Sequence, residues 1–250
     1  MILTNDITQL LAIDFTQGHV LLINKPLRWT SFDVVNKVRY AIKKHCGIRK
    51  IKVGHGGTLD PLATGVLVVG IGKETKNLMT YQNEPKEYVA EITFGATTAS
   101  YDLETPPEGN FETAHISAET IKKCLQTHFT GTIGQVPPIF SAKSVGGQRA
   151  YVAARNGEHV EMKSQEITIY NAELLDFAEN KAYICIACSK GTYIRSIAHD
   201  LGKQLQSGAY LSALTRTKSG GFSVEQCMTI EEFEALLNPT APLNPPSRGT

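Results

Sequence analysis

Apolar residues are arranged along the chain in runs of strand length. The segment HVLLIN at 19–24 and the run from Gly65 to Ile71 are short and continuously apolar, which predicts two buried strands. Residues 88–94 instead carry an apolar side chain at every even position, and that alternation predicts a half-buried strand. Two further runs, 166–177 and 181–189, flank a short polar turn and predict a hairpin.

Helical periodicity occurs in three segments. Thr30-Ser31 can cap a helix whose apolar residues from Val34 to Ile42 share one face. A second capped helix is predicted over 117–129, and a third after Arg195, where apolar residues recur every four positions. The residues just before the third helix are typical of a strand, so Tyr193 and Arg195, two positions apart, are predicted to face the same pocket.

The strands occur in neighbouring pairs, and helices are inserted among them irregularly. This order favours an α+β fold, with a mixed, largely antiparallel sheet and flanking helices, over a doubly wound parallel sheet. With 250 residues, 42% of them hydrophobic and 20% charged, the chain has the composition of an ordinary globular protein with a substantial core. We expect one domain over 1–237 and a flexible, proline-rich tail over 238–250.

The N-terminal residues lack the features of a targeting or membrane segment. There is no basic leader, and Asp6, Gln9 and Asp14 interrupt the apolar residues, so we expect a cytoplasmic protein. The five cysteines are scattered along the chain. Cys185 and Cys188 form a CxxC, but they lie in a predicted strand and would point to opposite faces, which argues against a zinc or redox site.

The net charge of +1 conceals an uneven distribution. Seven lysines and arginines lie between Lys37 and Lys52 without one acid, whereas the span from Glu84 to Glu119 is predominantly acidic. Such a basic run is either a solvated helix face or a surface that suits a phosphate backbone. Charge alone does not decide between the two.

One acid stands in a loop bounded by glycines, GHGGTLDPLATGVL at 54–67. The glycines complete neither G-x-G-x-x-G nor a P-loop, so a phosphate cradle is not predicted. Asp60 could cap a short helix that begins at Pro61, or it could be a functional carboxylate in a loop that a ligand can approach closely. The spacing leaves both interpretations open.

Five other motifs accompany this loop. They are Lys25-Pro26 with Thr30-Ser31, Lys86-Glu87-Tyr88, Pro137-Pro138-Ile139-Phe140-Ser141-Ala142 with Arg149-Ala150-Tyr151, Gly191-Thr192-Tyr193-Ile194-Arg195, and Leu211-Ser212-Ala213-Leu214-Thr215-Arg216. Together the motifs resemble those of the tRNA pseudouridine synthase B (TruB) family, from about Val20 to Leu237. The resemblance implies a pseudouridine synthase fold with an RNA-binding insertion, which would lie around Pro137 to Arg155.

The resemblance also implies an activity. The implied enzyme is an isomerase that flips uridine 55 out of the T-loop of tRNA and converts it to pseudouridine, without a metal or organic cofactor. Its implied partner is the T-arm of tRNA; we expect a monomer with no membrane and no obligate protein partner. Bacterial relatives commonly carry a C-terminal PUA domain, and none is expected here because only residues 238–250 follow Leu237.

The family's catalytic residues match three positions of this sequence. The counterpart of Asp60 is the nucleophile, and the resemblance pairs Arg195 with it. Tyr88 matches a tyrosine that stacks on the flipped base and is discussed as a proton-transfer group; without the family it would be a core residue of its strand. From the residues alone, a catalytically silent tRNA-folding module and an aspartate hydrolase of a small substrate remain alternatives.

Five further residues are expected to bind the substrate or support the loop: Lys25, His55, Asp102, Tyr193 and Leu214. By resemblance, Lys25 would support the catalytic loop, His55 would help to extrude the target base, and Asp102 would contact the RNA or the base.

Three positions depart from the family pattern. Gly56 stands where many members carry threonine, Ala99 replaces an acid, and Arg28 replaces a glycine. We expect these differences to alter loop rigidity and RNA contacts more than the reaction.

Overall fold

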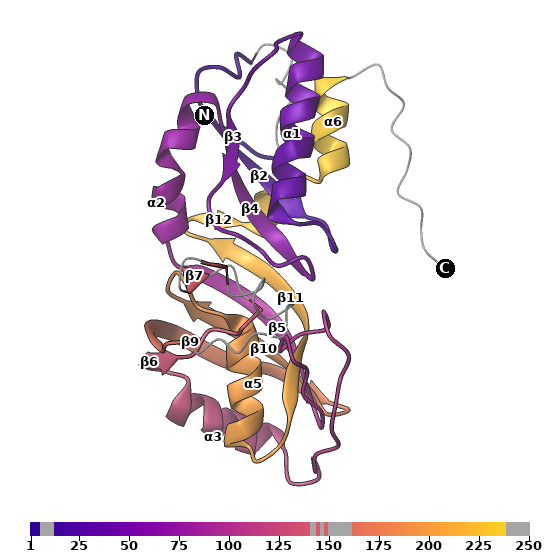
Figure 1. The fold of residues 1–250 in the computed structure, drawn as a ribbon, viewed down its shortest axis with the longest axis vertical. Helices are drawn as coiled ribbons and strands as arrows, with labels where there is room; N and C mark the ends of the chain where they lie inside the picture. Colours follow the sequence, from indigo (N-terminus) through magenta and orange to yellow (C-terminus); the bar gives the residue numbers. More distant parts are fainter. Residues whose placement is uncertain (6–12, 141–143, 146–147, 150–161, 239–250) are drawn as a thin grey trace, which may run out of the picture. The chain divides into compact units, whose positions relative to one another are not determined.

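The computed structural model describes residues 1–5, 13–140, 144–145, 148–149 and 162–238. In chain order its strands and helices are β1 Ile2–Leu3, β2 His19–Lys25, α1 Ser31–Cys46, β3 Val53–His55, β4 Ala63–Ile71, a 3-10 helix Gly72–Asn77, α2 Leu78–Asn83, β5 Lys86–Phe94, α3 Ala118–His128, β6 Gly131–Gln135, β7 Ser144–Val145, β8 Gln148–Arg149, β9 Gln165–Ala178, β10 Lys181–Cys188, α5 Ile194–Gln204, β11 Ala209–Ser219, β12 Phe222–Ser223, a 3-10 helix Val224–Gln226 and α6 Ile230–Leu237. Helices and strands mix irregularly, which confirms the α+β class (Figure 1).

The chain divides into two compact units. Unit 1 comprises residues 1–83 and 218–250, and unit 2 comprises residues 84–217. The expected RNA-binding insertion lies largely outside the described residues, apart from the short antiparallel pair of β7 and β8. Most of the expected tail, from residue 239 onward, also lies outside them. A single catalytic domain over 1–237 stays a prediction.

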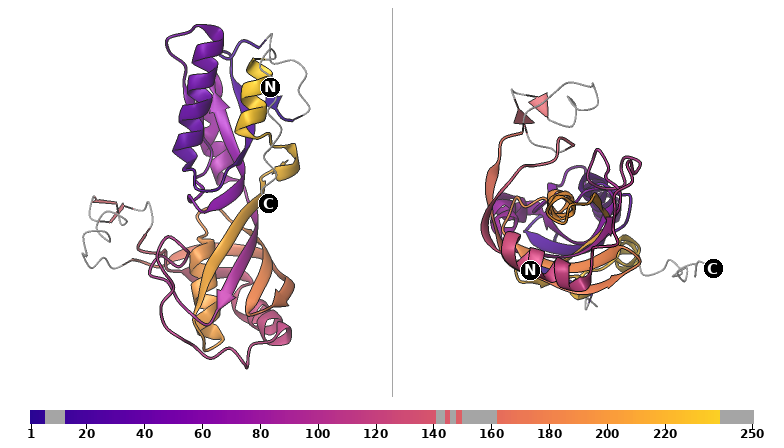
Figure 2. Two further views of the ribbon diagram at one scale, coloured as in Figure 1. Left: turned by 90° about the vertical axis from the view of Figure 1, so that its right-hand side faces the viewer. Right: turned by 90° about the horizontal axis from the view of Figure 1, so that it is seen from below.

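Unit 1 is a small sheet covered by two helices. Its strands run in the order β1-β2-β4, with β1 and β2 parallel, β2 and β4 antiparallel, and β3 also paired with β4. The same face of the sheet carries α1 and α6 (Figure 2), whose apolar residues join a core with side chains such as Leu21 and Leu67. Thr30 caps α1 through a reciprocal pair of hydrogen bonds with Asp33, as the sequence predicts for this segment.

In the larger sheet of unit 2 the strands run in the order β11-β5-β10-β9-β6, and β7 and β8 form a separate pair. β10 is antiparallel to both β5 and β9, and β6 is antiparallel to β9, so the expected antiparallel pairing is confirmed. The predicted hairpin joins β9 to β10 through Glu179 and Asn180, whose φ angles of 51° and 60° suit a tight hairpin turn. Of the helices, α5 contacts β5 and α3, and α3 contacts β9.

The segment before α5 differs from the prediction. It was expected to be a strand, but α5 begins at Ile194, so Tyr193 is the N-cap residue and Arg195 is the second helical residue. Gly191, with φ of 79°, separates the segment from β10. The helix forms because Ile194, Ile197 and other residues spaced at helical intervals are buried on one face, which outweighs the local preference of a short Thr-Tyr-Ile run for a strand.

Candidate active site

Asp60 lies in the loop between β3 and β4. Its side chain is half-buried. The amide of Ala63 donates to the carbonyl of Asp60 at 3.1 Å, which closes a turn over Pro61 and Leu62, and β4 begins directly at Ala63. No helix therefore follows Asp60 in this described segment, and the interpretation of Asp60 as a helix cap is wrong.

A serine holds the residue that precedes Asp60. The buried side chain of Ser31, the first residue of α1, donates from its hydroxyl to the carbonyl of Leu59 at 3.1 Å. The same hydroxyl accepts from the amide of Leu59 at 2.8 Å. Sequence reasoning treated Ser31 as a possible helix cap and as part of a family motif, and gave it no role in the site. Its contact with residue 59, 28 positions away, has no local sequence signal.

Lys25 holds the residue that follows Asp60. Its side chain is 0% exposed, although it carries a charge. The ammonium donates to the carbonyls of Trp29 at 2.6 Å, Pro26 at 2.9 Å and Pro61 at 3.3 Å. The three N–H groups of a lysine thus each meet a carbonyl oxygen, which satisfies the condition for burying such a group.

His55 and Gly56 form the other side of the loop. His55 is the last residue of β3 and stands opposite Val69 of β4. The next amide, that of Gly56, donates to the carbonyl of Val68 at 2.8 Å. A Cβ atom added at Gly56 would lie only 2.9 Å from the Cβ of Tyr81, so this departure from the family pattern has a steric reason in this chain.

In unit 2, Arg195 and Asp102 form an ion pair. The Nε atom of Arg195 lies 3.7 Å from an Asp102 carboxylate oxygen, and both residues are 3% exposed. The Nη1 atom of Arg195 donates to the carbonyls of Phe140 at 3.0 Å and Ser100 at 3.3 Å. The Asp102 carboxylate also accepts from the amide of Glu104 at 3.0 Å. The guanidinium is therefore held by a carboxylate and two backbone oxygens.

Gln135 fixes the backbone at Tyr193. Its buried side-chain amide donates to the Tyr193 carbonyl at 3.0 Å and accepts from the Tyr193 amide at 2.8 Å. Tyr193 itself is half-buried. Sequence reasoning did not find Gln135, since nothing but its position just before Pro137-Pro138 distinguishes it from a surface glutamine.

Tyr88 and Leu214 lie on neighbouring strands, β5 and β11, and each is 9% exposed. Tyr88 stands opposite Ile186 of β10. Lys86, two positions earlier on the same buried face of β5, has its pKa lowered to about 8, first by burial and then by the charge of Arg216.

The predicted residues thus fall into two groups. Lys25, His55 and Asp60 belong to unit 1, whereas unit 2 contains the remaining five, which are Tyr88, Asp102, Tyr193, Arg195 and Leu214. The structure brings Lys25 to the Asp60 loop and Asp102 to Arg195. The pairing of Asp60 with Arg195 would join residues of different units and stays a prediction.

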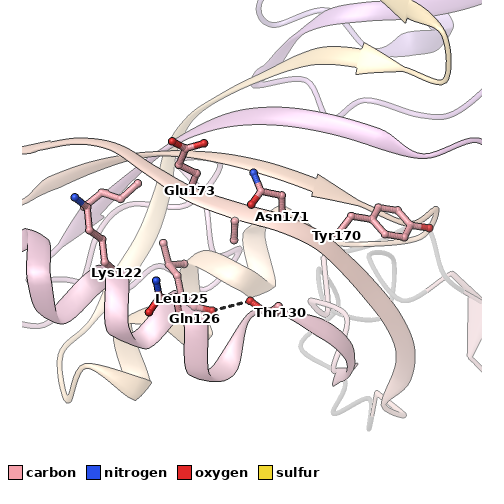
Figure 3. Close-up of a pocket in the computed structure, with 9 residues that line it drawn as sticks. Lys122, Leu125, Gln126, Thr130, Tyr170, Asn171 and Glu173 are labelled. Atoms are coloured by element: carbon pink, nitrogen blue, oxygen red, sulfur yellow. Dashed lines mark hydrogen bonds between the residues drawn. The ribbon is translucent and has the colours of Figure 1, made fainter.

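A separate cavity lies between α3 and β9. Its volume is about 340 Å³, and its lining includes Lys122, Gln126, Tyr170 and Asn171 (Figure 3). It contains none of the predicted residues.

The His, Cys, Asp and Glu side chains of the described residues form no cluster of three or more that could hold a metal ion. Over the same part of the chain, every helix is too short or too polar to span a bilayer.

Known solved structures share this fold. One neighbour, in the crystal structure of a Cbf5–Nop10–Gar1 complex, is 26% identical with a TM-score of 0.67 over 94% of this chain and 60% of that chain. Another, in a structure of an H/ACA RNP bound to a substrate RNA containing 2′-deoxyuridine, is 27% identical with a TM-score of 0.61 over 87% of this chain and 52% of that chain. This chain therefore spans little more than half the length of these neighbours.

Sequence relatives are closer and similar in length. The tRNA pseudouridine synthase B of Bacteroides thetaiotaomicron is 50% identical over 90% of this chain and 95% of the relative. That of Phocaeicola vulgatus is 48% identical over 90% and 96%. Another from Flavobacterium johnsoniae is 45% identical over 90% and 98%.

The fold and these relatives define the class as the pseudouridine synthases. Two family models match the chain: the N-terminal domain of the TruB family pseudouridylate synthases over residues 43–194, and the C-terminal domain of tRNA pseudouridylate synthase B over residues 195–241. The chain belongs to the TruB family.

Proposed function

We propose that this chain converts uridine 55 in the T-loop of tRNA to pseudouridine, with Asp60 as the nucleophile. The substrate class follows from the relatives, which are named tRNA pseudouridine synthase B, and from the family that the chain belongs to. Uridine 55 and the aspartate nucleophile follow from the resemblance of the Asp60 loop to the family's motif.

The observation that carries the proposal is the double anchoring of the Asp60 loop. Ser31 holds Leu59, and Lys25 holds Pro61, so the residues on both sides of Asp60 are bonded to buried polar side chains. A nucleophile must meet its target atom within a narrow range of distance and angle, and fixing it in advance lowers the entropy cost of the reaction. The anchored loop is therefore suited to hold a nucleophile at Asp60.

The reaction conserves all atoms of the uridine. The N1–C1′ bond breaks, the uracil turns, and a C5–C1′ bond forms; a proton leaves C5 and another is taken up by N1. The target base must first leave the loop of the RNA, which is where we assign roles to His55 and to the stacking ring of Tyr88. Arg195 would pair with Asp60 and keep its carboxylate ionised and oriented.

Pseudouridine mapping on an unmodified tRNA transcript tests the proposal. Wild-type protein should form pseudouridine at position 55 and nowhere else, and a transcript with cytidine at that position should give none. Asp60→Asn should still bind tRNA but form no product, because the change removes the nucleophile and hardly alters the shape. Turnover by Asp60→Asn within about tenfold of wild type would contradict the assignment of the nucleophile. Binding without any product from wild type would instead indicate a silent tRNA-folding module.

A further inference from the structure

Two aromatic rings that the predicted site does not include are stacked beside Arg195. The ring centroids of Tyr101 and His199 are 3.9 Å apart, and the planes are inclined by 11°. Tyr101 belongs to the segment between β5 and α3, and His199 belongs to α5. Both residues are in unit 2 and both are half-buried.

The stack is linked to Arg195 from two directions. Along α5, Arg195 and His199 are four residues apart, so their side chains lie on the same face of the helix. Along the other segment, Tyr101 stands between Ser100, whose carbonyl accepts from Arg195 at 3.3 Å, and Asp102, whose carboxylate is 3.7 Å from Arg195. Three consecutive residues of one segment therefore contact two side chains of the helix, one turn apart.

Tyr101 has an unusual backbone conformation. Its φ is 64°, in the left-handed region that residues with a side chain seldom adopt. This reversal allows the Ser100 carbonyl to meet Arg195 while the Tyr101 carbonyl accepts from the amide of Leu211 at 3.0 Å. Neighbouring contacts must hold a strained residue in place. The ring stack on His199 is one such contact.

The two rings are uncharged at neutral pH. Burial, followed by the charge of Lys203, lowers the pKa of His199 to about 4. Burial, followed by the charge of Asp200, raises the pKa of Tyr101. The Nδ1 atom of His199 is buried and has no hydrogen-bond partner among the described residues. The imidazole is therefore uncharged near neutral pH and packs as a flat ring against Tyr101.

We infer that Tyr101 and His199 are positioning residues, whose stack holds the Ser100–Asp102 segment against α5 and so fixes the guanidinium of Arg195. The inference rests on the proposed function, in which Arg195 orients Asp60. It deepens that function by naming two residues that act on the reaction only through Arg195.

Four variants separate the ring from the backbone. Tyr101→Asn removes the ring but keeps a residue that tolerates the left-handed conformation, and Tyr101→Phe keeps the ring. His199→Ala and His199→Phe form the matching pair. Tyr170→Ala, which removes an exposed tyrosine from β9 in the same unit, is the control.

With an unmodified T-arm hairpin as substrate, Tyr101→Asn and His199→Ala should lower kcat by about tenfold to a hundredfold, the range expected when a catalytic group is displaced by a fraction of an ångström to an ångström. KM should change by a smaller factor than kcat, although the displaced segment includes Asp102, an expected RNA contact. The two phenylalanine variants and the control should keep kcat within about threefold of wild type. A kcat for Tyr101→Asn and His199→Ala equal to that of the control would overturn the inference.

A double-mutant cycle with Arg195→Lys tests whether the stack acts through Arg195. In the Arg195→Lys background, Tyr101→Asn should lower kcat by no more than about threefold, because the group that the stack positions has already been replaced. If the double variant loses kcat by the product of the two single losses, the two changes act independently, and the inference is overturned. That result would also be expected if each single change lowered kcat through a general loss of structure. Failure of the proposed function would look different, because wild-type protein would then form no pseudouridine.

Discussion

The ammonium nitrogen of Lys25 lies 3.3 Å from the carbonyl oxygen of Pro61, the residue that follows Asp60. The same nitrogen donates to two carbonyls in the turn after β2, those of Pro26 and Trp29. A fully buried lysine thus connects the end of one strand to the loop that carries the proposed nucleophile. The contact gives a structural reason for a lysine at this position, which the resemblance alone associates with support of the loop.

Lys25→Met should therefore reduce both stability and activity. Methionine fills much of the same volume but leaves three carbonyl oxygens without their donor, which should lower the free energy of unfolding by roughly 2 to 4 kcal/mol. kcat should fall more than KM rises, because the Asp60 loop loses an anchor. Urea denaturation and steady-state kinetics would measure the two effects. Lys73→Met, which removes an exposed lysine of unit 1, is the control, and equal behaviour of the two variants would contradict this account.

Gly56→Ala tests the steric reason for the glycine beside His55. The added Cβ would lie 2.9 Å from the Cβ of Tyr81, and neither atom can move without its backbone. We expect a loss of about 1 to 3 kcal/mol in the free energy of unfolding, as for other overpacked sites. At Gly221, where an added Cβ meets nothing within 4 Å, the same substitution should be close to neutral. If both variants unfold at the same temperature, Tyr81 does not exclude a side chain at position 56.

The parts of the fold that depend on local periodicity could be predicted from the sequence. The strands β2, β4 and β5, the helix α1 and the β9–β10 hairpin follow from apolar spacing, capping residues and a polar turn. The error at Tyr193 and Arg195 arose where a short run has a strand-like composition but the packing of the residues after it favours a helix.

Only those residues of the site that belong to the family's motifs could be predicted from the sequence. Lys25 and Asp102 were assigned through motif positions, and the structure adds the contacts that they make. Ser31, Gln135 and the Tyr101–His199 pair could not be found, because each acts through a contact between residues that are distant in sequence. Such contacts depend on how elements pack, which periodicity does not specify.

Tyr88 should contribute its hydroxyl as well as its ring. Tyr88→Phe keeps the buried ring on β5 and removes only the hydroxyl, whereas Tyr88→Leu removes both. We expect both variants to lose at least about a hundredfold in kcat, the scale of a lost acid–base group. Single-turnover assays on a T-arm hairpin would measure the loss. Near-normal activity of Tyr88→Phe together with an inactive Tyr88→Leu would show that stacking alone accounts for this residue.

Lys86 should make stability depend on pH. Burial lowers its pKa from 10.5 to about 8 in the folded protein, so between these values the unfolded chain binds a proton that the folded protein does not. Stability should therefore rise with pH across this window. The free energy of unfolding of wild type minus that of Lys86→Met should increase by about 2 kcal/mol between about pH 7 and about pH 9.5. A difference that is constant or falls with pH would contradict a lowered pKa of Lys86 in the folded protein.

The basic end of α1 should contact the phosphate backbone of the RNA. Lys43 is half-buried and Lys44 is exposed, both in the last turn of the helix, whereas Lys37 already pairs with Glu234 at 2.8 Å. If Lys43 and Lys44 each neutralise one phosphate, replacing both by glutamine should reduce the slope of log Kd against log salt concentration by about 1.5.

Filter binding of a T-arm hairpin at several salt concentrations would measure that slope. The matched control replaces Lys122 and Lys123 of α3, two exposed lysines in unit 2, by glutamine. This variant has the same change in net charge, so a long-range effect of charge alone would lower both slopes equally. A smaller slope only for the α1 variant would show direct phosphate contacts at this helix, and an unchanged slope for that variant would show that its lysines form a solvated face.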